Sequence, residues 1–89
     1  MKTFVETTAS TEVGRRRLNQ ERAVIDLMEL ICELMEKDGV TRSDLAIRLG
    51  RTRGAISQFF NGRPNVTLCT VSDVFTALGY TMQFRVVKD

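Results

Sequence analysis

The chain has 89 residues, of which 43% are hydrophobic and 27% are charged, so it has room for one domain with one small core. It contains no histidine and only two cysteines, which excludes zinc sites built from Cys and His and catalysis by a histidine base. No apolar run approaches the ~18 residues that span a bilayer, and the N-terminus has no signal-peptide core, so we expect a cytoplasmic protein without a membrane segment.

The two cysteines, Cys32 and Cys69, lie far apart in the sequence among apolar residues. Their spacing matches no metal-binding or redox motif, and a single disulfide between them is the formal alternative. We expect two reduced thiols in the core.

Residues 1–17 lack a clear periodicity, and we interpret them as an arm that precedes the domain. Within the arm, residues 3–5 are compatible with a short helix or an edge strand. The three consecutive arginines at 15–17 either contact phosphate or form a solvated entrance to the next helix, and three exposed charges alone favour the solvated entrance.

A long helix is predicted over residues 18–37. Asn19 is the expected N-cap, Glu21 stands in the first turn, and Gly39 is a natural stop after the last turn. Apolar residues at spacings of three and four form the expected core-facing stripe: Val24, Leu27, Met28, Ile31, Leu34 and Met35.

Two short helices follow. Thr41 is the expected N-cap of the first, in a capping box that we expect to be weak because Asp44 replaces the usual Glu or Gln. Gly50 ends this helix, Thr52 caps the next, and Asn61 and Gly62 end that one, since both residues tolerate the left-handed conformation. The expected buried positions of the two helices are Leu45, Ala46, Leu49, Ala55, Ile56, Phe59 and Phe60.

A fourth helix is predicted between the N-cap Thr67 and Gly79, and residues 80–87 then alternate between larger apolar and other side chains, which is typical of a β-strand. A lone strand cannot satisfy its own backbone, so it must pair with residues 3–5 or with the same segment of a second copy. We favour the second arrangement, a homodimer formed through the C-terminal strand.

Charge is divided unevenly along the chain. Residues 20–38 contain six acids and two bases, a net charge of −4, whereas residues 41–63 contain five arginines and one acid, a net charge of +4. The basic segment suggests a polyanionic partner, and a solvated basic face is the alternative.

The segment TRSDLAIRLGRTRGAISQFFNGRP, residues 41–64, resembles the lambda-repressor-like helix-turn-helix family, also called the Cro/repressor or xenobiotic-response-element type. The resemblance extends over residues 18–79. It implies a mainly α, compact DNA-binding domain of four to five helices at 18–79, between the N-terminal arm (1–17) and the C-terminal β-strand (80–89).

The resemblance implies that the helix at 52–61 lies in the major groove of double-stranded DNA. The implied base contacts are Arg53, Gly54, Ser57 and Gln58. The implied phosphate contacts are Thr41, Arg42, Thr52, Asn61 and Arg63. We interpret the remaining arginines of this segment, Arg48 and Arg51, as solvated charges.

The function predicted from these residues is that of a sequence-specific transcriptional regulator, either a phage-type repressor or the antitoxin of a toxin–antitoxin pair, which would add a toxin to its partners. The alternative is a protein-interaction module on the same helix-turn-helix scaffold without direct DNA contact. No nucleophile–base pair is visible, so we expect no enzyme activity, no cofactor and no metal.

Overall fold

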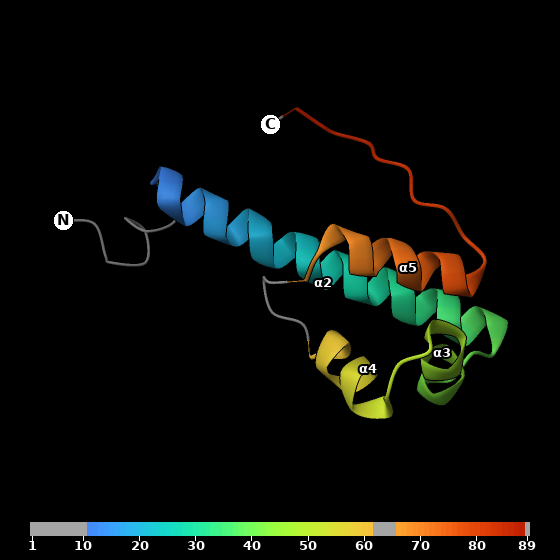
Figure 1. Cartoon of the computed structure of the whole chain (residues 1–89). Coiled ribbons are helices and arrows are strands. Elements are labelled where there is room, and N and C mark those ends of the chain that lie inside the picture. Colours follow the sequence, from blue (N-terminus) through green and yellow to red (C-terminus); the bar gives the residue numbers. More distant parts are fainter. Residues whose placement is uncertain (1–10, 62–65, 89) are drawn as a thin grey trace.

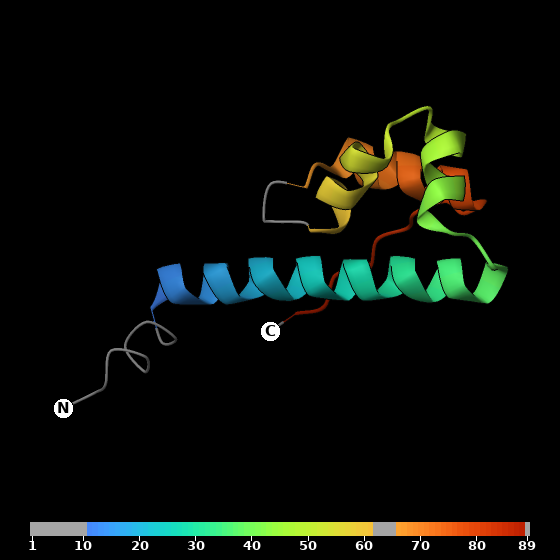
Figure 2. The ribbon, with the colours of Figure 1, turned by 90° about the horizontal axis from the view of Figure 1, so that it is seen from below.

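The computed structural model describes residues 11–61 and 66–88, and in these ranges the protein is built from four helices. They are α2 (Glu12–Asp38), α3 (Arg42–Leu49), α4 (Arg53–Phe60) and α5 (Leu68–Leu78). The three shorter helices gather on one side of the long rod α2, whose N-terminal end projects beyond them (Figures 1 and 2). The prediction of a mainly α fold is confirmed. None of the described helices is long and apolar enough to cross a membrane.

Helix α2 begins at Glu12, ahead of its predicted start at residue 18. Thr11 is the N-cap, because its side chain accepts a hydrogen bond of 3.0 Å from a backbone N–H three residues on. Asn19, the predicted cap, instead lies inside the helix. The arginines at 15–17 are therefore helical, and Arg16 lies 3.7 Å from Glu12.

The three shorter helices begin after threonine N-caps, as predicted. Thr52 and Thr67 each accept a hydrogen bond from the backbone N–H three residues on, at 3.1 and 3.2 Å. At Thr41 the capping box is complete: its hydroxyl accepts from the Asp44 N–H, and the Asp44 carboxylate accepts from the Thr41 N–H, both at 3.0 Å. The expectation that the shorter Asp44 side chain reaches back poorly is wrong.

Three helices end at a glycine, as predicted. Gly50 adopts a φ of 64°, where a Cβ would be strained, and this lets the chain turn from α3 toward α4; Gly39 and Gly79 end α2 and α5 in the same way. Asn61 ends α4, as predicted, with a φ of −81°, so it does not use the left-handed conformation that it tolerates; Gly62, the other predicted end residue, lies outside the described residues.

The core lies where α2, α3 and α5 meet. Its most completely buried side chains are Ile31 from α2, Leu45 from α3 and Val74 from α5, and Ile56 joins them from α4 with 2% exposure. Of the predicted α2 stripe, Ile31 and Met35 are buried and the other members are partly buried.

Both cysteines are exposed, so the prediction of two core thiols is wrong, although both are free. Cys32 follows the fully buried Ile31, and consecutive helical residues are turned away from each other around the axis. Cys69 lies before the buried Val71 on the outer side of α5. Apolar neighbours in the sequence were a poor guide to the burial of these cysteines, because a helix places consecutive residues on different faces.

The C-terminal segment is extended, but residues 80–88 form no strand among the described residues, so the predicted C-terminal β-strand is wrong. A strand requires ladder hydrogen bonds to a neighbour, and the candidate partner at residues 3–5 lies outside the described residues. Tyr80 instead closes the end of α5 with a backbone hydrogen bond of 2.8 Å to Phe75, and its hydroxyl donates to Asp38 at 3.1 Å.

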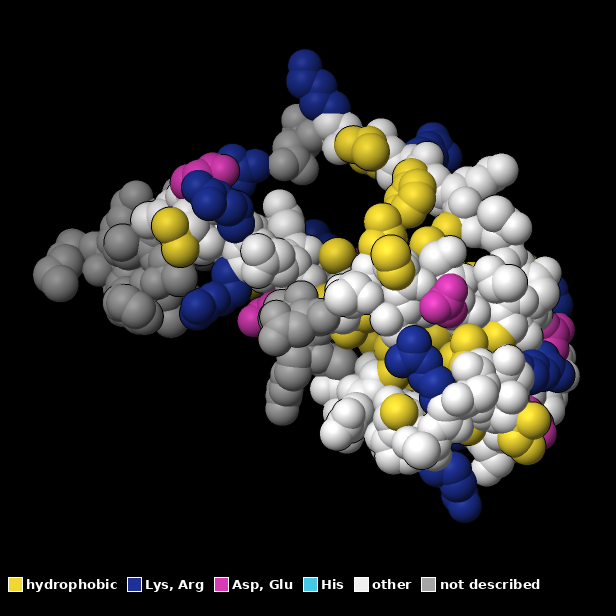
Figure 3. Space-filling view, viewed as in Figure 1, with side chains coloured by type: hydrophobic (Ala, Val, Ile, Leu, Met, Phe, Trp, Pro, Cys, Tyr) yellow, Lys and Arg dark blue, Asp and Glu magenta, His cyan; other side chains and the backbone are white. Residues whose placement is uncertain are grey.

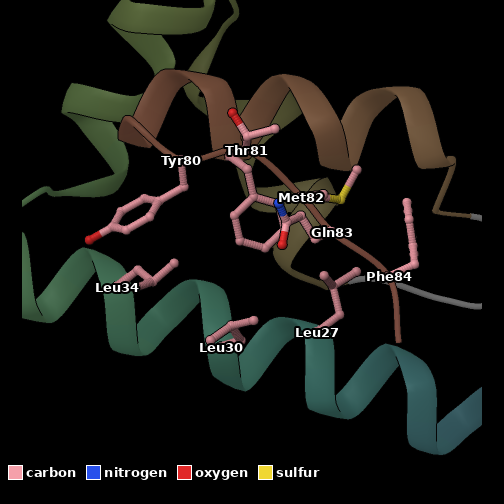
Figure 4. Close-up of a pocket in the computed structure, with 9 residues that line it drawn as sticks. Leu27, Leu30, Leu34, Tyr80, Thr81, Met82, Gln83 and Phe84 are labelled. Carbon is pink, nitrogen blue, oxygen red and sulfur yellow. The ribbon is translucent and has the colours of Figure 1, made fainter. Parts of the chain in front are cut away.

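The segment after α5 runs along α2 and encloses an apolar groove of about 420 Å³. Leu27, Leu30 and Leu34 project from α2 toward Tyr80 and the residues that follow it (Figure 4). Hydrophobic contact with α2 thus takes the place of strand pairing for the first part of this segment. Farther along the segment, the alternating apolar side chains are not buried by other described residues: Phe84 is 73% exposed and Val86 is 92% exposed.

Replacement of Leu45 by alanine tests the core. Leu45 is fully buried where α3 meets its neighbours, so Leu45→Ala should lower the free energy of unfolding by about 2–5 kcal/mol. Ile47→Ala on the same helix is the matched control, because Ile47 is 78% exposed and its loss should change that energy by less than about 0.5 kcal/mol. Urea unfolding followed by circular dichroism measures both, and equal losses would contradict this description of the core.

Candidate nucleic-acid interface

The candidate interface is built on α3 and α4, which pack against each other through a short turn. The Arg51 backbone N–H donates to the Ala46 carbonyl at 2.9 Å, which closes the turn. Ile56 fixes the inner side of α4 in the core. The helix is therefore held from one side, and its opposite side is open.

The open side of α4 carries every residue predicted to contact bases. Arg53, Gly54, Ser57 and Gln58 are all exposed, and α4 contains no acidic residue. Outside its own helix backbone and chain neighbours, a Cβ added at Gly54 would approach no atom of the described residues more closely than 3.9 Å, so their packing does not require glycine there. No side chain projects from α4 at this position, so a ligand can approach the helix backbone closely.

The residues predicted to contact phosphate border the same surface where the structure describes them. Thr41, Arg42, Thr52 and Asn61 are all exposed, whereas Arg63 lies outside the described residues. The hydroxyl oxygens of Thr41 and Thr52 accept hydrogen bonds from their own helices. The Thr52 hydroxyl uses only its acceptor capacity as a cap, so its hydrogen is available for an anion, whereas the Thr41 hydroxyl also interacts with the Asp44 carboxylate.

The guanidinium of Arg42 lies over the ring of Phe60, with 4.5 Å between Cζ and the ring centroid. This cation–π contact joins the first turn of α3 to the last turn of α4 and limits the positions of the charged group. Phe60 in turn packs edge-on against Phe59, with 5.4 Å between ring centroids. Sequence reasoning assigned a charge to Arg42 but missed this contact, which depends on how the two helices cross.

Arg48 is exposed, as we expected of a solvated charge, but it also makes a contact that we did not predict. Its Nη1 donates a hydrogen bond of 3.1 Å to the carbonyl oxygen of Ala77, in the last turn of α5. Carbonyls at a helix C-terminus lack helical partners and attract cations, so Arg48 links α3 to α5. Its position in the last turn of α3 was visible in the sequence, but nothing there indicated that α5 ends beside it.

Positive charge dominates this part of the molecule. Between residues 41 and 61 there are four arginines and one acid, Asp44, which is engaged in the capping box. Arginine side chains project at several points from the region that holds α3 and α4 (Figure 3). The described residues contain no group of acidic, histidine or cysteine side chains that would hold a metal ion. An exposed, acid-free helix bordered by arginines is chemically suited to a polyanion.

Comparison with known proteins adds no relative: the chain matches no protein-family description, no curated protein and no solved structure. The resemblance to the helix-turn-helix family therefore stays an expectation based on the residues of segment 41–64 and its surroundings. A function can be proposed only from the geometry of α3 and α4 and from the side chains that they expose.

The capping box at Thr41 gives a pH-dependent prediction. The hydrogen bonds from Thr41, chiefly that from its backbone N–H, hold the pKa of Asp44 below its ordinary value of 3.8. A carboxyl whose pKa is lowered by folding stabilises the protein above the unfolded pKa and loses this effect as the pH falls through the folded pKa.

Asp44→Asn should therefore destabilise the protein at pH 7, and its difference from the unsubstituted protein should shrink below pH ~4. Urea unfolding at a series of pH values measures this difference. Asp73→Asn is the control, because Asp73 is an exposed acid of α5 that makes no hydrogen bond to another described residue through its carboxylate. A difference that is independent of pH would contradict the role given to Asp44.

Proposed function

We propose that this protein is a sequence-specific DNA-binding transcriptional regulator that places α4 in the major groove of double-stranded DNA. The observation that carries the proposal is the open side of α4, which presents Arg53, Ser57 and Gln58 without an acidic neighbour in the helix. An α-helix with its side chains is about 10–12 Å across, which fits a major groove about 12 Å wide.

The side chains of α4 have distinct roles in this proposal. Arg53 stands at the first position of the helix, where its guanidinium would donate two hydrogen bonds to O6 and N7 of guanine. Gln58 has the donor and acceptor that pair with N7 and N6 of adenine, and Ser57 provides one hydroxyl beside it. Gly54 lets the helix backbone approach the bases at the turn where Arg53 binds.

The flanking residues would position the helix on the DNA backbone. Arg42 supplies a charge that Phe60 already orients, so less conformational freedom is lost when it binds a phosphate. Thr41 and Thr52 lie at helix N-termini, where the helix dipole favours an anion, and Thr52 also supplies a hydroxyl hydrogen. Such contacts determine orientation, whereas α4 determines sequence preference.

Either of two biological roles fits this activity: a phage-type repressor, or an antitoxin with a toxin as a further partner. Both roles imply a cytoplasmic protein, because the DNA it controls lies there. The alternative, a protein-interaction module without DNA contact, needs no arginine at the N-terminus of α4, and the binding experiment separates the two functions.

Arg53→Ala tests the base contact. The protein is first used to select its preferred duplex from a random DNA library, and the dissociation constant is then measured by fluorescence anisotropy. Arg53→Ala should weaken binding to the selected duplex by roughly 1–3 kcal/mol and reduce its preference over a scrambled duplex, whereas Arg42→Ala should weaken binding to both duplexes alike. Arg85→Ala is the control, since it removes a positive charge that is also exposed but lies in the C-terminal segment.

The salt dependence provides a second measurement. Affinity should fall steeply as salt rises, and the slope should become shallower by about one in Arg42→Ala, because one phosphate contact is lost. If no duplex is selected from the library, the protein-interaction alternative is favoured. If Arg53→Ala and Arg85→Ala have equal effects, α4 is not the helix that contacts the bases.

A further inference from the structure

The outer half of α2 lacks cover from the rest of the described chain. Residues 12–23 are all exposed apart from Gly14, and Ile25 just beyond them is 56% exposed (Figures 1 and 2). Leu18 and Val13 are 51% and 70% exposed. This segment continues a helix whose other half is packed in the core, and it leaves apolar side chains that a second surface could cover.

The exposed apolar positions of α2 follow a seven-residue repeat. Leu18, Ile25 and Cys32 lie seven residues apart and are all exposed, and a seven-residue spacing keeps side chains on nearly one face of a helix. Ile31, which packs in the core, is turned about 100° from Cys32 around the axis, and Met35, three residues after Cys32, lies at the border between the stripe and the core. In Figure 2 the other helices all lie on one side of α2, and the C-terminal segment crosses the view of the rod near its middle.

A second seven-residue repeat flanks this stripe and carries charge. Continued by seven residues toward the N-terminus, the stripe reaches Thr11. The residues that come four positions after Thr11 and after the three members of the stripe are two bases followed by two acids: Arg15, Arg22, Glu29 and Glu36. These are the positions whose charges determine partner and orientation when helices pair. The bases occupy the N-terminal half of α2 and the acids its C-terminal half.

This arrangement is complementary to itself in one orientation. Ile25 is the middle residue of α2, and an antiparallel second copy centred on Ile25 brings Arg22 level with Met28 of the second copy, which is one residue, about 1.5 Å along the axis, from Glu29. The same register brings Leu18 level with Cys32 of the second copy. A parallel arrangement would place like charges opposite each other along the whole stripe.

We propose that this face of α2, defined by Leu18, Ile25 and Cys32, is the interface of an antiparallel homodimer. The two-fold axis passes beside Ile25, and two equivalent Arg22–Glu29 ion pairs flank it. Within one chain Arg22 and Glu29 are separated by about 10 Å along the helix, so they do not pair with each other. This interface is independent of DNA binding and does not use the C-terminal segment.

Charge reversal tests the orientation. Sedimentation equilibrium over a range of protein concentrations should show a dimer whose dissociation constant rises roughly tenfold in Arg22→Glu and in Glu29→Arg, since each change converts two attractions into repulsions. The double variant Arg22→Glu with Glu29→Arg should restore the constant to within about threefold, because the pairs are rebuilt with reversed signs. Circular dichroism of each variant checks that the helix content is unchanged.

Cysteine cross-linking tests the register. In a Cys69→Ser background, Leu18→Cys should form a covalent dimer with the native Cys32 under mild oxidation, because cross-linking requires Cα atoms within about 7 Å. The same protein with Cys32→Ser is the matched control and should stay uncross-linked. Without Leu18→Cys, Cys32 should not cross-link to itself, since the two copies of Cys32 lie at opposite ends of the antiparallel pair.

Each contrary result overturns the proposal. A monomer throughout the concentration range removes the interface, and a Cys32–Cys32 cross-link shows a parallel pair. A dimer insensitive to both charge reversals uses another surface, for which the groove between α2 and the C-terminal segment is the next candidate. Arg53→Ala should leave the dimer mass unchanged, so failure here is distinct from failure of the DNA-binding proposal.

Discussion

The burial of one face of α3 is the constraint on which the rest of the structure depends. Leu45 is fully buried, and α3 is the helix that packs against both α4 and α5. Its ends carry the two arginine contacts that extend beyond this core: Arg42 reaches Phe60 at the end of α4, and Arg48 reaches Ala77 at the end of α5. The orientation of α4, and with it the candidate interface, follows from how α3 is held.

The helix termini are the part of the fold that the sequence predicts best. Thr41, Thr52 and Thr67 act as N-caps, and each capping contact joins residues only three apart in the chain, so local sequence is sufficient to identify it. The start of α2 shows the limit of the same signal. Thr11 and Asn19 are both acceptable caps, and the choice between them depends on how far a helix can extend without tertiary support.

Features that depend on tertiary contact are predicted poorly. The alternating pattern after Gly79 indicates a strand, but without a neighbour the segment lies on α2 by hydrophobic contact instead. For the candidate site, the sequence identifies which residues of α4 are exposed, because the opposite face is apolar. It does not reveal that Arg42 and Arg48 are held by other helices, since their partners are 18 or more residues away along the chain.

The position of Tyr80 has a practical consequence. It is the only tyrosine of a chain without tryptophan, so its ring is the source of intrinsic fluorescence. Its hydroxyl donates to the carboxylate of Asp38, at the point where α5, the C-terminal segment and the end of α2 meet. A phenol that is hydrogen-bonded to a carboxylate emits weakly. Release of the C-terminal segment from α2 would therefore raise the fluorescence intensity of Tyr80, and this intensity would report that motion without an added label.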